Sequence, residues 1–249
     1  MNLKQYVGKA MSRTFVIPDI HLKPKMLELA DNLIDKSSYD NIVFLGDVVD
    51  DWYQQNNIEL YRDTFREITG FIKKHDNVYF CYGNHDISYE WEALESGYSY
   101  SAGDVVMEGL NSIRNAILPE RIGFVHRIDS AIFSHAGITE KFVRNWLEID
   151  TFSEEYEIDH SIKMINLMRK KELWRDESPI WARPPYESAF PIESNYIQVA
   201  GHTPVMYPEL YGNILILDTF STNSWGDPIG DERFVWIDTK TCKWGYADA

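Results

Sequence analysis

Five short apolar runs in this chain of 249 residues are each followed by polar residues of the kind that bind metal ions. The runs are rich in β-branched and aromatic residues, which is typical of buried strands. They occupy residues 14–18, 41–45, 77–82, 131–133 and 196–200. We therefore expect five strands that end at one edge of a sheet, where the polar residues gather.

Helical patterns separate the first three runs. Apolar residues recur at helical spacing over residues 26–34 and again over residues 60–72. The order strand, helix, strand, helix, strand predicts parallel βαβ units with right-handed crossovers. In such sheets ligands bind beyond the carboxyl ends of the strands, so the polar residues after each strand stand where a site forms.

The second half has a more antiparallel pattern. Residues 121–128 and 130–136 read as a hairpin that turns at Asp129 and Ser130. Helical patterns follow at 139–147 and 158–168. We expect strands at 214–217, 233–237 and 243–246 to complete a second sheet, and residues 1–13 to form an arm or a first helix.

The domain organisation predicted from length is a single domain over residues 1–249. Residues 88–121 interrupt the regular pattern and read as an insertion beside the site, with a helix near 105–117. Residues 174–195 contain four prolines and read as a lid-like loop. Its aromatic residues Trp174, Trp181 and Tyr186 could stack on a base or aryl group, although packing within the Pro-rich loop is the favoured explanation.

Composition argues against several classes of protein. The formal net charge of -15 opposes binding to nucleic acid or anionic lipid, so we expect neither a nucleic-acid nor a membrane partner. The only cysteines, Cys81 and Cys242, cannot supply a disulfide framework or a thiolate metal site. No window has the length and hydropathy of a membrane span, and we expect a cytoplasmic location.

The polar clusters contain oxygen and imidazole ligands. Such ligands suit Mn, Fe, Zn or Mg. The clusters are Asp19-Ile20-His21, Gly46-Asp47-Val48-Val49-Asp50, Gly83-Asn84-His85-Asp86, Ser134-His135-Ala136-Gly137 and Gly201-His202-Thr203-Pro204.

Taken in order, these motifs resemble those of the calcineurin-like metallophosphoesterases over about residues 14–220. The bacterial and phage phosphoprotein phosphatases and diadenosine tetraphosphatases are the most similar branch. Its Gly-His-Thr-Pro and Trp-Ser/Ala-Arg motifs are similar to residues 201–204 and to Trp181-Ala182-Arg183. The resemblance implies an α/β fold of two central mixed β-sheets flanked by helices.

The resemblance also implies a centre of two divalent metal ions, which we expect to be Mn²⁺, with Fe, Zn or Mg as alternatives. Asp19 and His21 would bind the first ion, and Asp47 would bridge both. The second ion would be completed by Asn84, His135 and His202. In this family a hydroxide that bridges the metals attacks phosphorus in line with the leaving group.

Three further residues receive roles by the same resemblance. His85 would be the general acid that protonates the leaving oxygen, and Asp50 would hold its ring. Arg183 would bind phosphate oxygens through its guanidinium fork.

One departure from the family pattern bears on the substrate. The phosphoprotein phosphatases carry a phosphate-binding Arg where this chain has Asp51, followed by Trp52. A carboxylate there should repel a phosphate dianion, which weakens the case for dedicated phosphoserine or phosphothreonine specificity.

We expect a phosphomonoesterase that acts on a small-molecule or phosphoprotein phosphate. The alternatives are a dinucleoside polyphosphate hydrolase, a phosphodiesterase, or a binding scaffold without catalysis on the same fold. His75, His126 and His160 match no motif and are expected to lie outside the site. Asp218 could equally support the site or form a turn.

Overall fold

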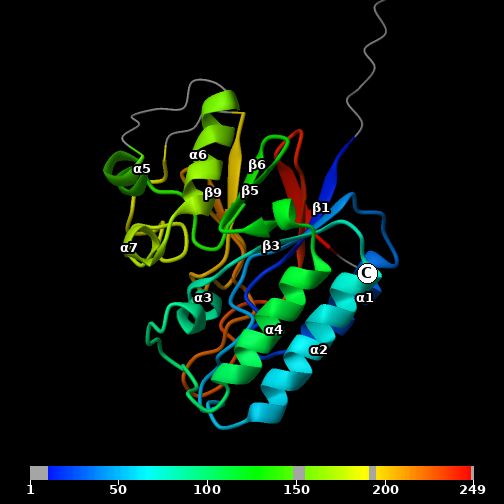
Figure 1. The fold of residues 1–249 in the computed structure, drawn as a ribbon. Helices are drawn as coiled ribbons and strands as arrows, with labels where there is room; N and C mark the ends of the chain where they lie inside the picture. The colour runs from blue at the N-terminus through cyan, green and yellow to red at the C-terminus, as the bar shows by residue number, and fades with distance from the viewer. Residues whose placement is uncertain (1–10, 148–154, 191–194, 248–249) are drawn as a thin grey trace, which may run out of the picture.

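The computed structural model describes residues 11–147, 155–190 and 195–247. Most of the arm or helix predicted for residues 1–13 lies outside these residues. Two mixed sheets stand side by side in the centre of the molecule (Figure 1). The first has the strand order β11-β10-β1-β2-β3-β4, and the second has the order β5-β6-β7-β9-β8.

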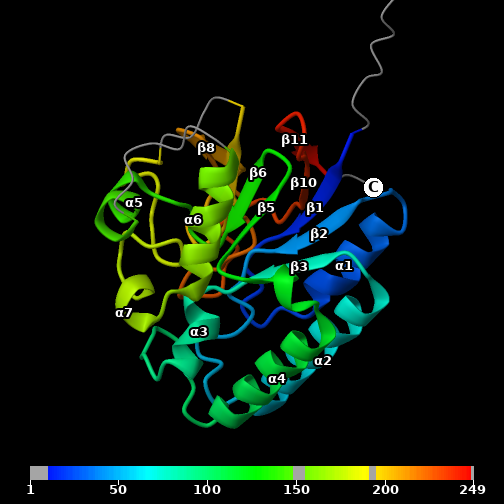
Figure 2. The same cartoon turned by 45° about the horizontal axis from the view of Figure 1, so that its top comes forward.

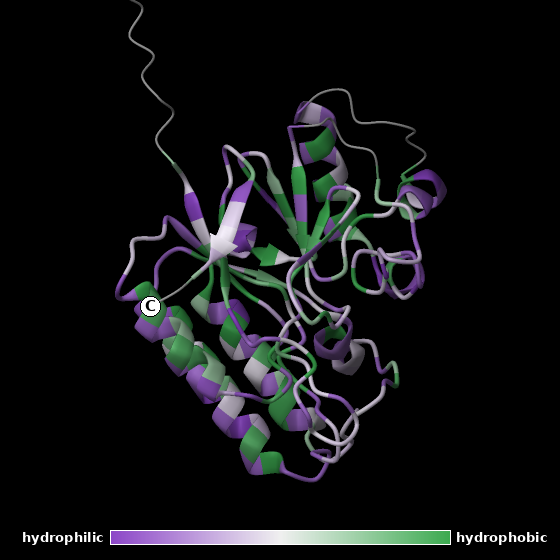
Figure 3. Ribbon diagram, turned by 180° about the vertical axis from the view of Figure 1, so that it is seen from behind, coloured by the Kyte–Doolittle hydropathy of each residue, from purple (hydrophilic) through white to green (hydrophobic). Residues whose placement is uncertain are grey.

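The strands of the first sheet combine a parallel centre with an antiparallel edge. They are β1 (Arg13–Ile17), β2 (Asn41–Phe44), β3 (Val78–Cys81), β4 (Ile122–Gly123), β10 (Val235–Asp238) and β11 (Lys243–Tyr246). β1, β2 and β3 are parallel, as predicted, with α1 (Lys25–Ile34) and α2 (Ile58–Lys74) as the connecting helices. Each helix packs its apolar face on the sheet, which agrees with the mixed hydropathy of these helices in Figure 3.

The second sheet begins with the predicted hairpin. β5 (Val125–Ile128) pairs antiparallel with β6 (Ala131–Ser134), and Ile128 faces Ala131 across the turn. β7 (Ile197–Ala200) and β9 (Ile214–Ile216) continue the sheet in parallel, and β8 (Glu209–Tyr211) closes its edge antiparallel to β9.

Two expectations about the sheets are wrong. The five ligand-bearing strands do not share one sheet, because β1, β2 and β3 belong to the first sheet and β6 and β7 to the second. β10 and β11 do not extend the second sheet, since β10 pairs antiparallel with β1. This pairing provides partners for the backbone N–H and C=O groups along the edge of β1, which would otherwise be unpaired in the middle of the molecule.

The faces of the two sheets share a buried core. Val16, Val43, Phe133, Val199 and Leu215 belong to one apolar cluster that draws residues from both sheets. The carboxyl ends of the ligand-bearing strands can therefore meet even though the strands lie in different sheets.

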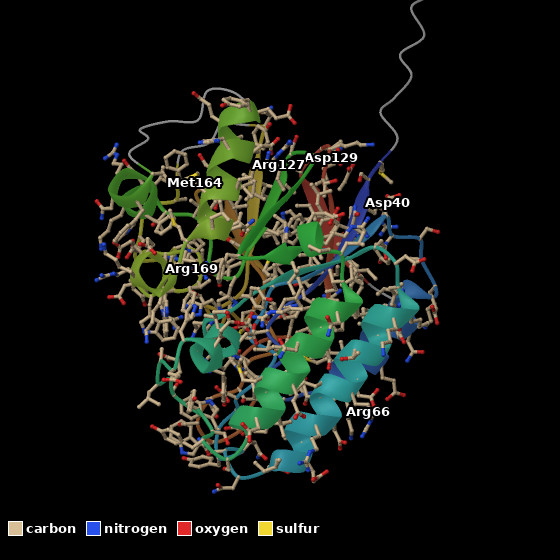
Figure 4. The ribbon with its side chains drawn as sticks, in the orientation of Figure 1. Asp40, Arg66, Arg127, Asp129, Met164 and Arg169 are labelled. Atoms are coloured by element: carbon tan, nitrogen blue, oxygen red, sulfur yellow. The ribbon has the colours of Figure 1, made fainter. Side chains whose placement is uncertain are left out.

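Helices cover the outer faces of the pair of sheets. Figure 2 shows α1, α2 and α4 (Gly103–Ala116) on one side and α6 (Glu155–Leu167) on the other. α2 and α4 approach closely at Gly109, where an added Cβ atom would come within 2.2 Å of the Phe65 ring. On the other side Arg127 of β5, labelled in Figure 4, pairs with Asp159 of α6 at 2.6 Å.

The two irregular segments flank the ends of the strands. Residues 88–121 contain the end of α3 (Asn84–Glu90), a turn-rich stretch, α4 and the short helix η1 (Pro119–Arg121). After α5 (Glu140–Trp146) and α7 (Lys170–Leu173), residues 174–190 consist mostly of turns; residues 191–194 of the predicted lid lie outside the described part. Among the described residues, no helix has the length and apolar character needed to cross a membrane.

Candidate metal centre

Asp47 lies at the meeting point of the two sheets. It follows β2 in a left-handed backbone conformation, with φ of 49°, and its side chain is 2 % exposed. Gly83, after β3, leaves room for this carboxylate, because a Cβ atom there would stand 2.0 Å from Asp47 Oδ1. Gly201, after β7, does the same for Asp19, with a Cβ atom 2.0 Å from Asp19 Oδ1. The glycines of these two motifs thus make room for carboxylates.

One group of ligand atoms surrounds His135 Nε2. This atom lies 3.2 Å from Asp47 Oδ2, 3.0 Å from Asn84 Oδ1 and 3.0 Å from His202 Nδ1. His135 Nδ1 donates to the Leu45 carbonyl at 2.8 Å, which directs Nε2 toward the group and makes it the nitrogen that can bind a metal ion when the ring is neutral. Four candidate ligands from both sheets therefore converge on one point.

A second group surrounds His21. Its Nε2 lies 3.8 Å from Asp47 Oδ2 and 3.9 Å from Asp19 Oδ2. Its Nδ1 donates to the Asp50 carbonyl at 2.8 Å, which again directs Nε2 toward the carboxylates. Ligand atoms of His21, Asp47 and His85 lie within 4.8 Å of one another, as do those of Asp47, His135 and His202. Asp47 is common to both sets.

The electrostatics of the two groups suit divalent cations. Burial, Asp218 and Asp47 raise the pKa of Asp19 well above its ordinary value. Burial lowers the pKa of His135, but Asp47 and Asp19 outweigh it and raise the pKa to about 9. His202 Nε2 is buried and has no hydrogen-bond partner among the described residues. Crowded buried carboxylates beside imidazole nitrogens fit a pair of metal ions.

His85 and Asp50 form an imidazole–carboxylate pair beside these groups. His85 Nδ1 lies 3.1 Å from Asp50 Oδ2, and the His85 backbone N–H donates to Asp47 Oδ1 at 2.9 Å. Burial lowers the pKa of His85, but Asp47 and Asp50 raise it to about 9. The Nδ1 contact leaves Nε2 as the ring nitrogen available to a substrate.

Sequence reasoning gave no role to Asp86. This buried carboxylate accepts the backbone N–H groups of Asp47, Val48 and Gly83, each at 2.9 Å. It therefore ties the loop after β2 to the loop after β3. Its place as the fourth residue of the Gly-Asn-His-Asp motif was the available signal.

A cavity of about 180 Å³ opens over the two groups. Its walls include Asp51 and Trp52 after β2, Glu95 in the segment before α4, and Trp181 and Arg183 in the segment before β7. The volume is below the roughly 300–1,000 Å³ of typical ligand pockets, so the cavity suits a phosphoryl group and the nearest part of a leaving group.

Arg183 lies at the cavity, as predicted for a phosphate ligand, but its guanidinium is occupied at one nitrogen. Nη1 donates to the His202 carbonyl at 3.1 Å. Trp181 stands edge-on to His202 with ring centroids 5.6 Å apart, whereas Trp174 packs against Trp181 and Tyr186 is exposed.

The three histidines that match no motif have partners outside the two groups of ligand atoms. His75 pairs with Asp31, and His160 stacks on Tyr156. His126 is buried and donates from Nε2 to the Phe80 carbonyl of the first sheet. Asp218 combines both readings: it caps a turn by accepting from Ser221, and it lines the cavity.

The strand ends of the two sheets bring buried carboxylate, imidazole and amide ligands around one shared aspartate. This arrangement defines a metal-dependent hydrolase of the α/β class. The sequence profile of the calcineurin-like phosphoesterases matches residues 12–209, and the chain belongs to that family.

Solved structures with similar folds include several phosphoesterases. A protein serine/threonine phosphatase from Saccharomyces cerevisiae is 14% identical, with a TM-score of 0.47, over 92% of this chain and 74% of that one. An archaeal phosphodiesterase is 11% identical, with a TM-score of 0.40, over 94% and 98% of the two chains. A metallophosphoesterase from Sphaerobacter thermophilus is 13% identical, with a TM-score of 0.43, over 95% and 87%. No curated protein matches the chain.

Proposed function

We propose that this chain is a dinuclear metal-dependent phosphatase that hydrolyses phosphomonoesters. The observation that carries the proposal is the position of Asp47, which belongs to two groups of ligand atoms while its Oδ1 accepts the backbone N–H of His85. This arrangement supports His85 as the general acid beside an aspartate that would bind both ions.

The residues that would hold the two ions are those the sequence suggested. Asp19 and His21 would hold one ion, Asn84, His135 and His202 the other, and Asp47 both. Two divalent cations, Mn²⁺ being the pair we expect, would neutralise phosphate charge and lower the pKa of a bound water molecule.

The other residues handle the proton and the substrate. His85 would present Nε2 to the leaving oxygen and donate a proton to it, while Asp50 holds Nδ1. The guanidinium nitrogens of Arg183 other than Nη1 would contact phosphate oxygens at the cavity.

The walls of the cavity favour a leaving group without negative charge. Asp51 and Glu95 both line the cavity, and the Glu95 carboxylate lies close enough to His85 to raise its pKa. Hydrolysis of diadenosine tetraphosphate would expel ADP, whose phosphates these carboxylates would repel. An alcohol expelled from a small-molecule monoester or a phosphoprotein meets no such repulsion.

The proposal is tested by metal analysis followed by a substrate panel with the Mn²⁺-loaded protein. The panel contains 4-nitrophenyl phosphate, glycerol 2-phosphate, a phosphopeptide, bis(4-nitrophenyl) phosphate and diadenosine tetraphosphate. We expect the monoesters to give the highest kcat/KM. Preference for the tetraphosphate or the diester would favour the corresponding alternative, and turnover of none would favour a binding scaffold.

A further inference from the structure

Asp50 is surrounded by more partners than an orienting carboxylate requires. It is 1 % exposed, and one oxygen, Oδ2, faces His85 Nδ1. The other, Oδ1, accepts two phenolic hydroxyl groups, from Tyr61 at 2.9 Å and from Tyr89 at 2.5 Å. Neither tyrosine belongs to a motif that the sequence singled out.

The two tyrosines approach Asp50 from different elements. Tyr61 lies on α2 and is fully buried, and Tyr89 lies on α3, four residues after His85. Burial and the nearby Asp50 raise the pKa of both phenols, so both remain protonated donors at neutral pH. A carboxylate that receives two hydroxyl groups on one oxygen has little freedom to rotate away from the imidazole on the other.

Tyr89 also connects this pair to the segment before α4. Its hydroxyl oxygen accepts the Ser99 backbone N–H at 2.9 Å, and its ring stacks on Tyr98 with centroids 4.3 Å apart. The same segment contributes Glu95 to the cavity wall. The segment before α4 therefore supports both the orientation of His85, through Tyr89 and Asp50, and the cavity wall at Glu95.

We propose that Tyr61 and Tyr89 are positioning residues for general-acid catalysis, acting on His85 through Asp50. The proposal rests on the proposed function, because it concerns the proton that the leaving alkoxide needs. Their importance should depend on the leaving group: an alkoxide needs the proton, whereas 4-nitrophenolate leaves almost without it.

The test compares Tyr61→Phe, Tyr89→Phe and the double variant with the wild type, all loaded with Mn²⁺. For glycerol 2-phosphate we expect kcat to fall about tenfold or more in the double variant, with KM nearly unchanged. For 4-nitrophenyl phosphate we expect a fall of less than about threefold, because that leaving group depends little on the acid. Tyr82→Phe removes a buried hydroxyl that contacts Arg114 instead, so it serves as the matched control.

A second readout does not depend on turnover. In the zinc-loaded protein, the His85 Nδ1–H proton should give a downfield NMR signal, assigned by its loss in His85→Ala. We expect this signal to broaden or move upfield in the tyrosine variants and to stay in place in Tyr82→Phe. Equal loss of activity on both esters, or an unchanged signal in a folded double variant, would overturn the positioning role. A wild type that hydrolyses neither ester would instead refute the proposed function, while the NMR comparison would still decide the contact.

Discussion

At the scale of single residues, the site depends on backbone conformations that most side chains avoid. His21, Asp47, Asp50 and His202 all have positive φ, between 42° and 64°. Left-handed conformations at non-glycine residues are uncommon. They cluster at functional sites, where the surrounding structure holds the backbone in place. Here each one turns the chain sharply after a strand, so that a ligand or its orienting partner points into the cavity.

His85 can be assigned as acid or as ligand by one substitution. Its ring atoms lie within 4.8 Å of ligand atoms of His21 and Asp47, which is compatible with either role. If it is the acid, His85→Ala should lower kcat for glycerol 2-phosphate by about 100- to 10,000-fold and leave the metal content unchanged. The measurement is steady-state kinetics beside elemental analysis of the same sample; a variant that has lost metal would make His85 a ligand.

Substitution of Glu95 tests whether the charge of the cavity wall disfavours a negatively charged leaving group. Glu95→Gln keeps the shape of the cavity wall and removes its charge, so repulsion of an ADP leaving group should weaken. We expect kcat/KM for diadenosine tetraphosphate, relative to glycerol 2-phosphate, to rise about three- to tenfold. Glu92→Gln, three residues earlier and exposed, is the control and should leave the ratio unchanged. An unchanged ratio in Glu95→Gln would show that this carboxylate does not affect the choice of substrate.

At the scale of elements, local patterns predicted the strands, the helices and the pairing of strands that are neighbours in sequence, but not the pairing of strands that are far apart in sequence. The periodicity of residues 60–72 and the hairpin at Asp129 and Ser130 depend on neighbours in sequence, and both are present. The pairing of β10 with β1 depends on a free strand edge more than 200 residues away, which no local pattern records.

The same difference between local patterns and contacts with other elements applies to the residues of the site. The motifs carried all six candidate metal ligands, because each ligand lies just after one of the five predicted strands. Asp86, Tyr61 and Tyr89 were missed as supporting residues, since each contacts a residue on another strand-end loop or helix and their residue types are common in helices and turns.

His126 should make the contact between β5 and β3 sensitive to pH. It donates from Nε2 to the Phe80 carbonyl at 3.0 Å, and burial lowers its pKa to about 4. The unfolded chain therefore binds this proton first, near pH 6.5, and the associated stability is present above that pH and lost as the pH falls toward 4. Between pH 7 and pH 5 we expect about 2 kcal/mol of the free energy of unfolding to disappear through this group.

Urea denaturation at both pH values checks this expectation in the metal-free protein. His126→Gln keeps a side-chain donor but cannot titrate, so its loss of stability between the two pH values should be smaller by about that amount. His160→Gln replaces a histidine that is exposed on α6 and should behave as the wild type does. Equal losses in all three proteins would show that His126 does not govern this transition.

At the scale of the whole molecule, the metal centre is a junction between the two sheets. Asp19, Asp47 and Asn84 follow strands of the first sheet, and His135 and His202 follow strands of the second. Burial first, and then repulsion from Asp218 and Asp47, raise the pKa of Asp19. Cations bound there would remove this repulsion and connect the sheets at the ends of their strands.

Metal binding should therefore stabilise the entire fold. With free Mn²⁺ at 100 times its Kd, one site that exists only in the folded chain adds about 2.7 kcal/mol, which for a chain of this size raises Tm by about 5 to 10 °C. Calorimetry of metal-free protein before and after addition of Mn²⁺ measures the shift. Asp47→Asn should abolish most of it, because the amide weakens both groups of ligands, whereas Glu108→Gln, exposed on α4, should retain it. A full shift in Asp47→Asn would mean that the stabilising ions bind elsewhere, and the two sheets would then be held together by their shared core alone.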